Sequence, residues 1–274
     1  MSRIYSYAFS KAVSDYIVDP ITSLSIIKEC IDLIPSFDIN YDQSDALITA
    51  IRHKDYQLVK LLVENGINVN IQNDQAIITA CLLSTVDILK LLISYGADPT
   101  ARNNEPICVA SRIDIIQILM DSGANPFAQN NRPFCNACRT QNLPLVKFLI
   151  EIKANCTEPN NKPICLAFYN YGYIELKKLL LDNGADPNAI IVDDEYHRVD
   201  CGEKYILDRA ICNCDLASCE LLLEYGADIE LCQIKSKYSM VGPPPSNYYY
   251  KHEDEQKIIN LLKNHGLDID NSIC

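Results

Sequence analysis

Residues 91–99 read Leu-Leu-Ile-Ser-Tyr-Gly-Ala-Asp-Pro: an aliphatic pair, three further residues, Gly, a small residue and then Asp. The same motif, with Asn in place of Asp in some copies, recurs along most of the chain. The copies end at Asn68, Asp98, Asn125, Asn155, Asp186, Asp228 and Asp268, and a degenerate first copy ends at Asn40. A motif that recurs at a regular spacing in the sequence predicts repeated supersecondary structure.

A second motif, which ends in Ala and often has Pro at its second position, follows the early copies of the first motif. Its closing residues are Ala50, Ala80, Ala110, Ala137, Ala167 and Ala210, with steps of 30, 30, 27, 30 and 43 residues. A period near 30 residues indicates a stack of repeats, because each repeat can bury its apolar stripe only against its neighbours.

Each repeat is predicted to contain two short helices. Pro106, Pro133 and Pro163 suit the first turn of the first helix, where a fixed φ and a missing N–H do no harm. The second helix carries aliphatic residues at helical spacing. The Gly that follows is expected in the left-handed position that ends a helix. The next Asp or Asn is expected to hydrogen-bond to nearby backbone amides and to open the turn.

These two motifs resemble the ankyrin repeat, whose consensus is approximately T-P-L-H-x-A-A followed by V-V-x-L-L-x-x-G-A-D-x-N. The resemblance covers roughly residues 36 to 270. It implies an all-α ankyrin-repeat solenoid of helix-turn-helix repeats joined by β-hairpin-like fingers, about seven to eight repeats including degenerate caps. The short, Ile-, Asn- and Tyr-rich repeats are similar to those of ankyrin proteins from giant amoebal, mimivirus-like viruses.

The sequence differs from the family pattern in three places, and each difference leads to a structural expectation. Cys108, Cys135 and Cys165 stand where the family has His, so its loop hydrogen bond is expected to be weakened or lost. Lys153 replaces a Gly, and a left-handed residue other than Gly costs about 1–2 kcal/mol. The repeat that closes at Ala110 is three residues short, which predicts almost no turn between its two helices.

The chain divides into four segments by sequence. Residues 1–35 are predicted to form an N-terminal helical cap or degenerate repeat, with helices at about 5–18 and 22–34. The segments that follow are the repeats at 36–230 with a long finger insertion at 189–204, a Pro/Tyr-rich insertion at 231–252, and a capping helix and tail at 253–274. The Pro/Tyr-rich insertion is either a stiff loop or a polyproline-II ligand.

Composition excludes several classes of partner. The 274 residues include 24 basic and 36 acidic ones, a net charge of −12, which argues against binding to nucleic acid or to anionic membranes. No apolar run approaches the ~20 residues of a membrane span. The start of the sequence does not read as a signal peptide, so we expect a cytoplasmic protein in which most of the 13 cysteines act as small buried hydrophobic residues.

No sequence motif indicates catalysis, and we expect neither an enzyme nor a cofactor. Cys135-x-x-Cys138 falls on repeat positions and is predicted to pack in the core. The alternative function is a metal- or redox-regulated module at the Cys/His cluster of residues 197–219. This cluster consists of His197, Cys201, Cys212, Cys214 and Cys219. No paired C-x-x-C there sets tetrahedral geometry, so no metal site is predicted.

The ankyrin resemblance implies a protein partner bound in a concave groove of finger tips and first helices. The candidate partner-binding residues are Arg52, Asn73, Leu82, Asn103, Arg112, Asn130, Arg132, Arg139, Lys162 and Tyr169. Several arginines on an acidic chain favour a partner with an acidic segment, and Leu82 and Tyr169 are candidate apolar anchors. The expected function is a non-enzymatic interaction scaffold, in the viral case an effector acting on host proteins in the host cytoplasm. The competing site is the pair of insertions, 190–204 and 232–250.

Overall fold

The computed structural model describes residues 7–9, 11–12, 15, 20–33, 39–40, 45–169, 172–191, 204–232 and 252–266. Within these ranges the chain is helical, and its β pairing consists of an isolated antiparallel bridge between Ile190 and Tyr205. The predicted all-α repeat fold is therefore confirmed. Most of the Pro/Tyr-rich insertion, residues 192–203 of the long finger and the tail from residue 267 lie outside the described residues.

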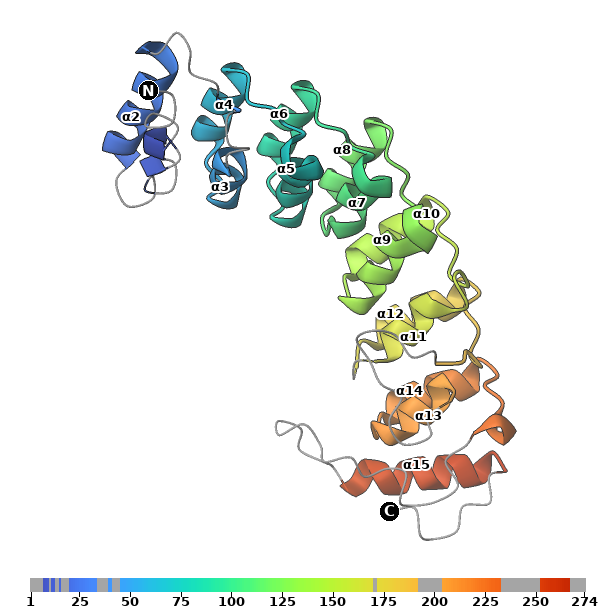
Figure 1. Cartoon of the computed structure of the whole chain (residues 1–274). Coiled ribbons are helices and arrows are strands. Elements are labelled where there is room, and N and C mark those ends of the chain that lie inside the picture. The colour runs from blue at the N-terminus through green and yellow to red at the C-terminus, as the bar shows by residue number, and fades with distance from the viewer. Residues whose placement is uncertain are drawn as a thin grey trace. The chain divides into compact units, whose positions relative to one another are not determined.

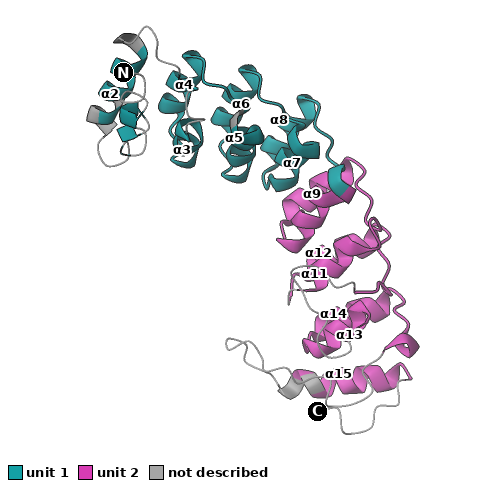
Figure 2. Cartoon of the chain, viewed as in Figure 1, with its two compact units in different colours: residues 1–129 teal, residues 130–274 magenta. Residues whose placement is uncertain are grey.

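The helices follow one another in pairs, and the chain divides into two compact units, residues 1–129 and 130–274 (Figures 1 and 2). Unit 1 holds α2 (Pro20–Leu33), α3 (Ala46–Arg52), α4 (Tyr56–Glu64), α5 (Ile71–Leu82), α6 (Val86–Ser94), α7 (Ala101–Val109) and α8 (Ile113–Asp121). The boundary falls within α9 (Ala128–Arg139). Unit 2 continues with α10 (Leu143–Glu151), α11 (Lys162–Phe168), α12 (Ile174–Asp182), α13 (Ile206–Cys212), α14 (Leu216–Glu224), the short 3-10 helix η2 (Ile229–Leu231) and α15 (His252–Asn264).

In unit 1 each first helix packs against its own second helix and against the first helix of the next repeat. Thus α5 contacts α3, α6 and α7, and α6 contacts α4 and α8 (Figure 1). The apolar stripe of each second helix is buried between repeats, as with Ile88, Leu89 and Leu92 of α6. Unit 2 repeats this arrangement with α11 against α13 and α12 against α14. The fold is thus a stack of helix pairs, as the 30-residue period predicts.

The ends of the second helices follow the predicted chemistry. Gly96 has a φ of +89°, and the Ala97 N–H donates to the Leu92 carbonyl at 3.0 Å, which closes a Schellman motif. Lys153 takes the same left-handed position with a φ of +75°, and Ala154 N–H donates to Leu149 O at 2.8 Å. A lysine therefore adopts the conformation that glycine takes at the other helix ends.

The Asp or Asn after each helix end opens the next turn, as expected. In six repeats its side-chain oxygen accepts a hydrogen bond from the backbone N–H two residues later, at 2.8–3.0 Å. The acceptors are Asn68, Asp98, Asn125, Asn155, Asp186 and Asp228. This bond fixes the chain direction locally and explains why these residue types return with the period.

The shortened repeat has lost residues from a helix, while its linker keeps the usual number of residues. The linker between α7 and α8, residues 110–112, is as long as residues 83–85 between α5 and α6. The three missing residues are lost from α7, which ends at Val109, three residues after Pro106, whereas α9 ends six residues after Pro133. The linker contains no turn, in keeping with the expectation, because Ala110 and Arg112 are extended where residues 83–84 form a turn. The repeat has also lost about one turn of its first helix.

The described fingers are built on left-handed turns rather than on paired strands. Three successive residues have φ between 49° and 65° in each of the segments 72–74, 102–104 and 129–131. These segments lie within the bounds of α5, α7 and α9, so the regular part of each of these helices begins after them. Asn tolerates this conformation better than most residues, and Asn occupies the middle position each time. Hairpin-like pairing is found in the long finger, where Ile191 N–H donates to Lys204 O at 2.8 Å. We refer to the three left-handed segments as finger turns.

Both ends of the stack carry helices with buried apolar residues. In α2, Ile27 and Cys30 are buried, and in α15 the buried residues are Ile258, Ile259 and Leu262. Helix α15 contacts α14, as expected of a helix that covers the end of the stack. Among the described helices, none is both long enough and apolar enough to cross a lipid bilayer.

Candidate functional site

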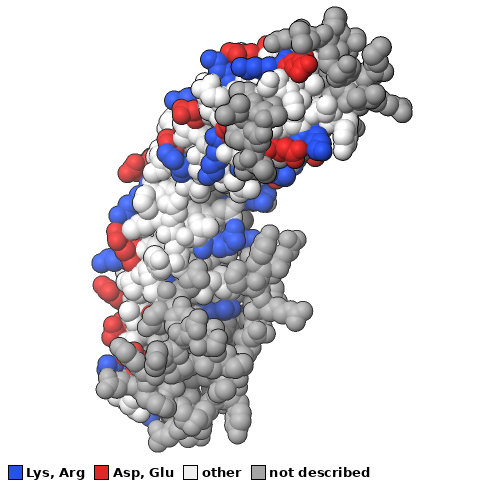
Figure 3. All heavy atoms as spheres, turned by 90° about the vertical axis from the view of Figure 1, so that its left-hand side faces the viewer, with Lys and Arg blue, Asp and Glu red and all other residues white. Residues whose placement is uncertain are grey.

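The exposed charges of both signs are distributed unevenly over the molecule. In the upper part of Figure 3, Lys and Arg alternate with Asp and Glu, so no patch of a single sign forms there. In the lower part of the same face, side chains of both signs lie along the left-hand edge, and basic ones also lie further in, among uncharged residues. The candidate surface is therefore best considered separately in each unit.

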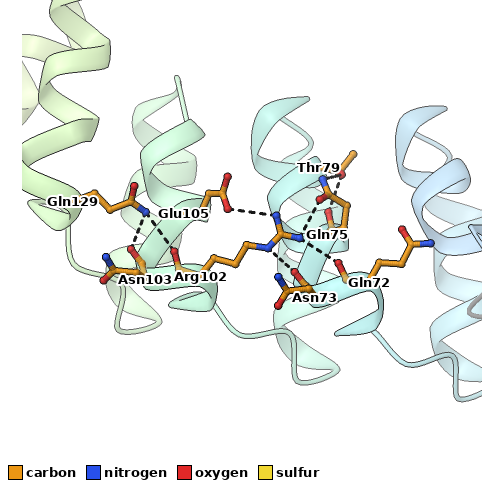
Figure 4. A network of polar contacts seen from close by, with 8 residues as sticks. All are labelled: Gln72, Asn73, Gln75, Thr79, Arg102, Asn103, Glu105 and Gln129. Carbon is orange, nitrogen blue, oxygen red and sulfur yellow. Dashed lines mark hydrogen bonds and ion pairs between the residues drawn. The ribbon is translucent and has the colours of Figure 1, made fainter. Parts of the chain in front are cut away.

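In unit 1 the finger turns are connected by Arg102. Its Nε donates to the Asn73 carbonyl at 2.7 Å, and its Nη2 donates at 3.2 Å both to the Gln72 carbonyl and to Gln75 Oε1. Nη1 lies 3.5 Å from Glu105 Oε2 (Figure 4). Arg102 thus reaches from its own finger turn to the preceding one and satisfies two of its backbone carbonyls.

The contact repeats at the neighbouring fingers. Gln129 Nε2 donates to the carbonyls of Arg102 at 3.3 Å and of Asn103 at 3.0 Å (Figure 4). Gln72 Nε2 donates in turn to Asp45 Oδ1. We call Gln72, Arg102 and Gln129 the finger ladder, since each stands first in its finger turn and bonds to the previous repeat. The ladder fixes turns that would otherwise be strained.

Sequence reasoning missed the finger ladder. The signal that was present is position, because each member comes directly before an Asn at the middle of its turn, 30 and then 27 residues apart. Residue type did not reveal it, since Gln and Arg share only the ability to donate to carbonyl oxygens. The ladder was therefore recognisable only once the turns were seen side by side.

The asparagines of the fingers have two different roles. Asn104 Oδ1 accepts from the Asn125 N–H at 2.8 Å, and Asn131 Nδ2 donates to the Asn155 carbonyl at 3.0 Å, so the third residue of a turn bonds to the next repeat. The middle residues, such as Asn73 and Asn103, are exposed. Figure 4 shows their amides directed away from the ladder and toward the same side. They are held on fixed turns with their amides facing solvent.

Most of the predicted binding residues are exposed side chains on fingers or near the ends of first helices. The exposed ones are Arg52, Asn73, Leu82, Asn103, Arg112, Asn130, Arg132 and Lys162. Leu82, at the end of α5, is 62% exposed, which is unusual for an aliphatic residue and fits an apolar anchor. Arg139 and Tyr169 are half-buried.

The structure corrects the position and the charge of Arg112. Because α7 is short, Arg112 does not extend a first helix but lies in the linker before α8. Its Nε and Nη2 bind the two carboxylate oxygens of Asp114 at 3.0 and 2.6 Å, a pairing that lowers the pKa of Asp114. Arg112 therefore adds little net charge to a binding surface.

Unit 2 has a more uniform charge. The exposed and half-buried charged residues of its first helices are all basic: Arg132 and Arg139 on α9, Lys162 on α11 and Arg209 on α13. Lys204, just before α13, is also exposed. We call these five residues the basic face. Asp208, the acidic residue among these helices, is fully buried and accepts hydrogen bonds from the Lys204 and Tyr205 N–H groups at 3.0 and 2.9 Å.

An aromatic contact orders part of the basic face. The Arg209 guanidinium lies 4.7 Å from the centroid of the Tyr169 ring, a cation–π distance that joins α13 to the end of α11. Tyr169 was predicted as an apolar anchor, whereas Arg209 was not predicted. Arg209 was difficult to identify from the sequence, because it comes directly before Ala210, whereas Tyr169 follows the Ala that ends its motif.

The buried cysteines are packing residues. Cys135 and Cys138 are both buried, and desolvation raises the pKa of Cys135 to about 11 and that of Cys138 well above its usual value. This confirms the prediction that they pack in the core. Cys165 Sγ lies 3.4 Å from the Ile190 carbonyl, so this thiol retains a weak form of the family's loop hydrogen bond.

The alternative of a metal-regulated module is not favoured. His197 and Cys201 lie outside the described residues, whereas Cys212 and Cys214 are half-buried and Cys219 is buried. In the part of the chain that the structure describes, no three His, Cys, Asp or Glu side chains are grouped as metal ligands would be.

Comparison with known proteins agrees with the geometry. A family model described as ankyrin repeats (3 copies) matches residues 22–103 and again residues 106–191. No curated protein is similar enough in sequence to be matched. Among solved structures, the human ASB11 ankyrin repeat domain is 20% identical with a TM-score of 0.59, covering 78% of this chain and 96% of that one. The ankyrin repeat domain of Bcl-3, a member of the IkappaB family, is 22% identical with a TM-score of 0.51, covering 68% and 87%.

Proposed function

The chain belongs to the ankyrin-repeat family, and on this premise we propose that it is a non-enzymatic scaffold that binds a partner protein through its finger turns and first helices. The observation that carries the proposal is the finger ladder. It holds exposed amides at Asn73 and Asn103 on turns whose geometry is set by hydrogen bonds to neighbouring repeats. A surface that is ordered before binding loses little conformational entropy when a partner docks.

The proposed surface also includes the exposed ends of the first helices. In unit 1 these are Arg52 on α3 and Leu82 on α5. A largely exposed leucine beside polar side chains is the usual composition of a contact patch with an apolar centre and a polar rim. We prefer this surface to the insertions 190–204 and 232–250, because its residues are already positioned by packing.

The partner proposed here is a protein with an acidic segment, acting in the cytoplasm. The support is the basic face of unit 2, on a chain whose net charge is −12. Cysteines that pack as free thiols in the core fit a reducing compartment. The similarity of the short repeats to those of giant amoebal viruses makes a host protein the natural candidate, with this chain as a viral effector.

The test is a comparison of bound proteins. Full-length chain is used to capture partners from host-cell extract, beside a variant with Asn73→Ala, Leu82→Ala and Asn103→Ala. The matched control carries Asp87→Ala, Lys90→Ala and Ser94→Ala on α6, which are also exposed. We expect a saturable partner that the first variant loses and the control retains. If the first variant retains it and excision of residues 235–250 removes it, the insertion is the binding site instead.

A further inference from the structure

We infer that unit 1 binds, at the linkers between its first and second helices, a peptide segment of a partner protein in which carboxylates stand close to an apolar side chain such as leucine. We call the surface the linker patch. It consists of Arg52, His53 and Lys54 after α3, Leu82 and Leu83 after α5, and Val109 and Ile113 on either side of the linker between α7 and α8. The inference rests on the proposed function and adds the place and the chemistry of one contact.

The first helices of unit 1 differ in length at the end where the linkers begin. Helices α3 and α5 continue for two residues past Ala50 and Ala80, whereas α7 ends one residue before Ala110. Because α5 and α7 pack side by side (Figure 1), the last turn of α5 has no counterpart on α7. This difference distinguishes α7 from the two first helices before it.

Apolar side chains are exposed where the turn is missing. Leu82, in the last turn of α5, is 62% exposed, and Ile113, the first residue of α8, is 37% exposed. Leu83 and Val109 are half-buried. These four residues come from the ends of elements that contact one another, α5 with α7 and α7 with α8. Such a group gains from burial against a partner, because that removes its apolar surface from water.

A basic turn precedes this apolar group in the stack. Arg52, His53 and Lys54 follow one another at the end of α3, and α3 packs against α5. All three are exposed, and within the described part of the chain their side chains take part in no hydrogen bond or ion pair. Arg52 and His53 occupy the repeat positions of Leu82 and Leu83, so the packing of a repeat does not require leucine there.

The carboxylates of the same linkers leave the basic turn largely uncompensated. Asp55 is half-buried and accepts from the Leu58 N–H at 2.9 Å, and Asp114 is paired with Arg112 at 2.6 Å. Asp87, in the first turn of α6, is exposed and contributes one negative charge. The linker patch therefore has cationic side chains beside apolar ones.

This combination selects the chemistry of the ligand. Carboxylates suit Arg52 and Lys54, and an apolar side chain suits Leu82 and Ile113. A peptide segment can carry both groups within a few residues. A nucleic acid or an anionic membrane is a poorer fit, because a chain of net charge −12 repels extended arrays of phosphates.

The probe is a fluorescein-labelled peptide, Gly-Asp-Glu-Asp-Gly-Ser-Leu-Leu-Gly-amide, measured by fluorescence anisotropy with the full-length chain. We expect saturable binding that weakens as salt is added. Replacing the acidic residues with Asn-Gln-Asn, or Leu-Leu with Ala-Ala, should each weaken binding at least fivefold. Unchanged binding of either altered peptide overturns the combined chemistry, and a lack of saturable binding overturns the inference as a whole.

A substitution of Leu82 tests the apolar part of the patch. Leu82→Gln should weaken binding of the peptide at least fivefold. The matched control is Tyr95→Gln at the end of α6 in the same repeat, since Tyr95 is also an exposed apolar residue, at 45%, and should have less than a twofold effect. Circular dichroism should show both variants folded. Equal effects of the two substitutions overturn the assignment of the site to Leu82.

Removal of charge tests the basic turn. Arg52→Gln with Lys54→Gln should weaken binding of the peptide at least fivefold. Lys90→Gln with Lys178→Gln, at exposed positions of the second helices α6 and α12, changes the net charge equally and should have less than a twofold effect. Equal losses in the two double variants mean that only net charge matters, which overturns the assignment to the basic turn.

Lengthening α7 tests the role of the missing turn. Insertion of Ala-Gln-Gln between Ala110 and Ser111 restores the 30-residue spacing and should extend α7 beside the last turn of α5. Binding of the peptide should weaken at least fivefold. Unchanged binding by a folded insertion variant overturns the role of the shortened helix, and if the variant does not fold, Leu82→Gln and its control decide.

The cellular partner separates this inference from the proposed function. If Asn73→Ala with Asn103→Ala loses the captured partner while Leu82→Gln retains it, the proposed function holds and this inference is wrong. If Leu82→Gln also loses the partner and the peptide competes with the partner for the wild-type chain, the linker patch is part of the binding surface.

Discussion

Lys177 Nζ lies 3.0 Å from Asp215 Oδ2, and the two side chains are only 1% and 5% exposed. Lys177 belongs to α12, and Asp215 is the N-cap residue of α14. Lys177 also donates to Ser218 Oγ at 2.7 Å, so its charge is both paired and hydrogen-bonded. The pair joins the second helices of two consecutive repeats that the long finger separates in the sequence. It therefore sets how the repeats on either side of that insertion align.

Removing one charge of this pair is expected to be more harmful than removing both. Lys177→Met leaves Asp215 buried without its cation and should lower the free energy of unfolding by about 3–5 kcal/mol. Lys177→Met combined with Asp215→Asn should recover most of that loss, since Asn also caps a helix. Urea denaturation of the wild type, both single variants and the double variant gives the coupling energy. Additive losses would show that the two side chains do not interact.

High pH is expected to destabilise the fold through its thiols. Burial raises the pKa of Cys135 to about 11 and that of Cys81 to about 12, against 9.0 when exposed. The folded chain then binds more protons than the unfolded chain above pH 9, so stability is complete below pH 9 and is lost toward pH 11–12. Each pKa unit corresponds to about 1.4 kcal/mol per thiol.

Lys177 acts in the opposite direction, because burial lowers its pKa and its contribution to stability rises with pH toward 10.5. Since several thiols are buried and one lysine is, we expect a net fall in the free energy of unfolding between pH 9 and 11. Cys135→Ala should reduce the slope, whereas Lys177→Met should make it steeper. A flat profile would mean that the buried thiols ionise as easily in the fold as outside it.

Lys153→Gly is expected to stabilise the chain by about 1 kcal/mol. Lys153 has a φ of +75°, where Gly is free of the steric conflict that other residues meet. The matched control is Gly184→Ala at the equivalent position of α12, with a φ of +86°. A Cβ at Gly184 meets no atom within 4 Å, so the loss of stability in Gly184→Ala reports only the backbone strain at this positive φ. The denaturation midpoints should move in opposite directions, and a midpoint for Lys153→Gly at or below the wild type would contradict the strain.

The features that could be predicted from the sequence are those governed by local rules. Gly96, Asp98 and Pro106 each act on the backbone within a few residues, so their type and spacing were sufficient to predict helix ends and starts. The shortening of α7 was not predicted, because a deletion does not reveal which segment it shortens. The linker is kept because Ala110 and Arg112 must be extended, with ψ of 137° and 138°, to reverse the chain, while the end of α7 can be lost.

The contacts between repeats were not predictable in the same way. Arg102 and Asn73 are 29 residues apart, and Lys177 and Asp215 are 38 apart. The type of a residue does not show which residue of a neighbouring repeat it will contact, because that depends on how the repeats stack. The candidate surface was likewise predicted residue by residue, and most members proved to be exposed. Its division into a ladder in unit 1 and a basic face in unit 2 depends on pairings that only the structure shows.

Deletion of residues 252–274 is expected to cause aggregation. Ile258, Ile259 and Leu262 of α15 are buried, and α15 packs against α14. Without α15 the apolar side of the last repeat is exposed as a continuous patch. Size-exclusion chromatography should show oligomers, and replacing only residues 267–274 with an unrelated polar tail should not. A monomeric deletion variant with unchanged helicity would show that α15 does not cap the stack.

Arg102→Met tests whether the finger ladder stabilises the stack of unit 1. The substitution keeps an unbranched apolar stem but removes the donors to Asn73 O, Gln72 O and Gln75 Oε1, leaving two finger carbonyls without this partner. A loss of about 1–3 kcal/mol is expected, together with faster amide exchange in residues 70–75. Arg102→Lys should not restore stability, because an ammonium group lacks the planar fork that reaches several acceptors at once. The control is Arg112→Met, whose pair with Asp114 is 53% and 46% exposed and should contribute little to stability. Equal losses in the two methionine variants would mean that Arg102 acts as an ordinary surface residue, and the fixed geometry of the finger turns would then need another cause.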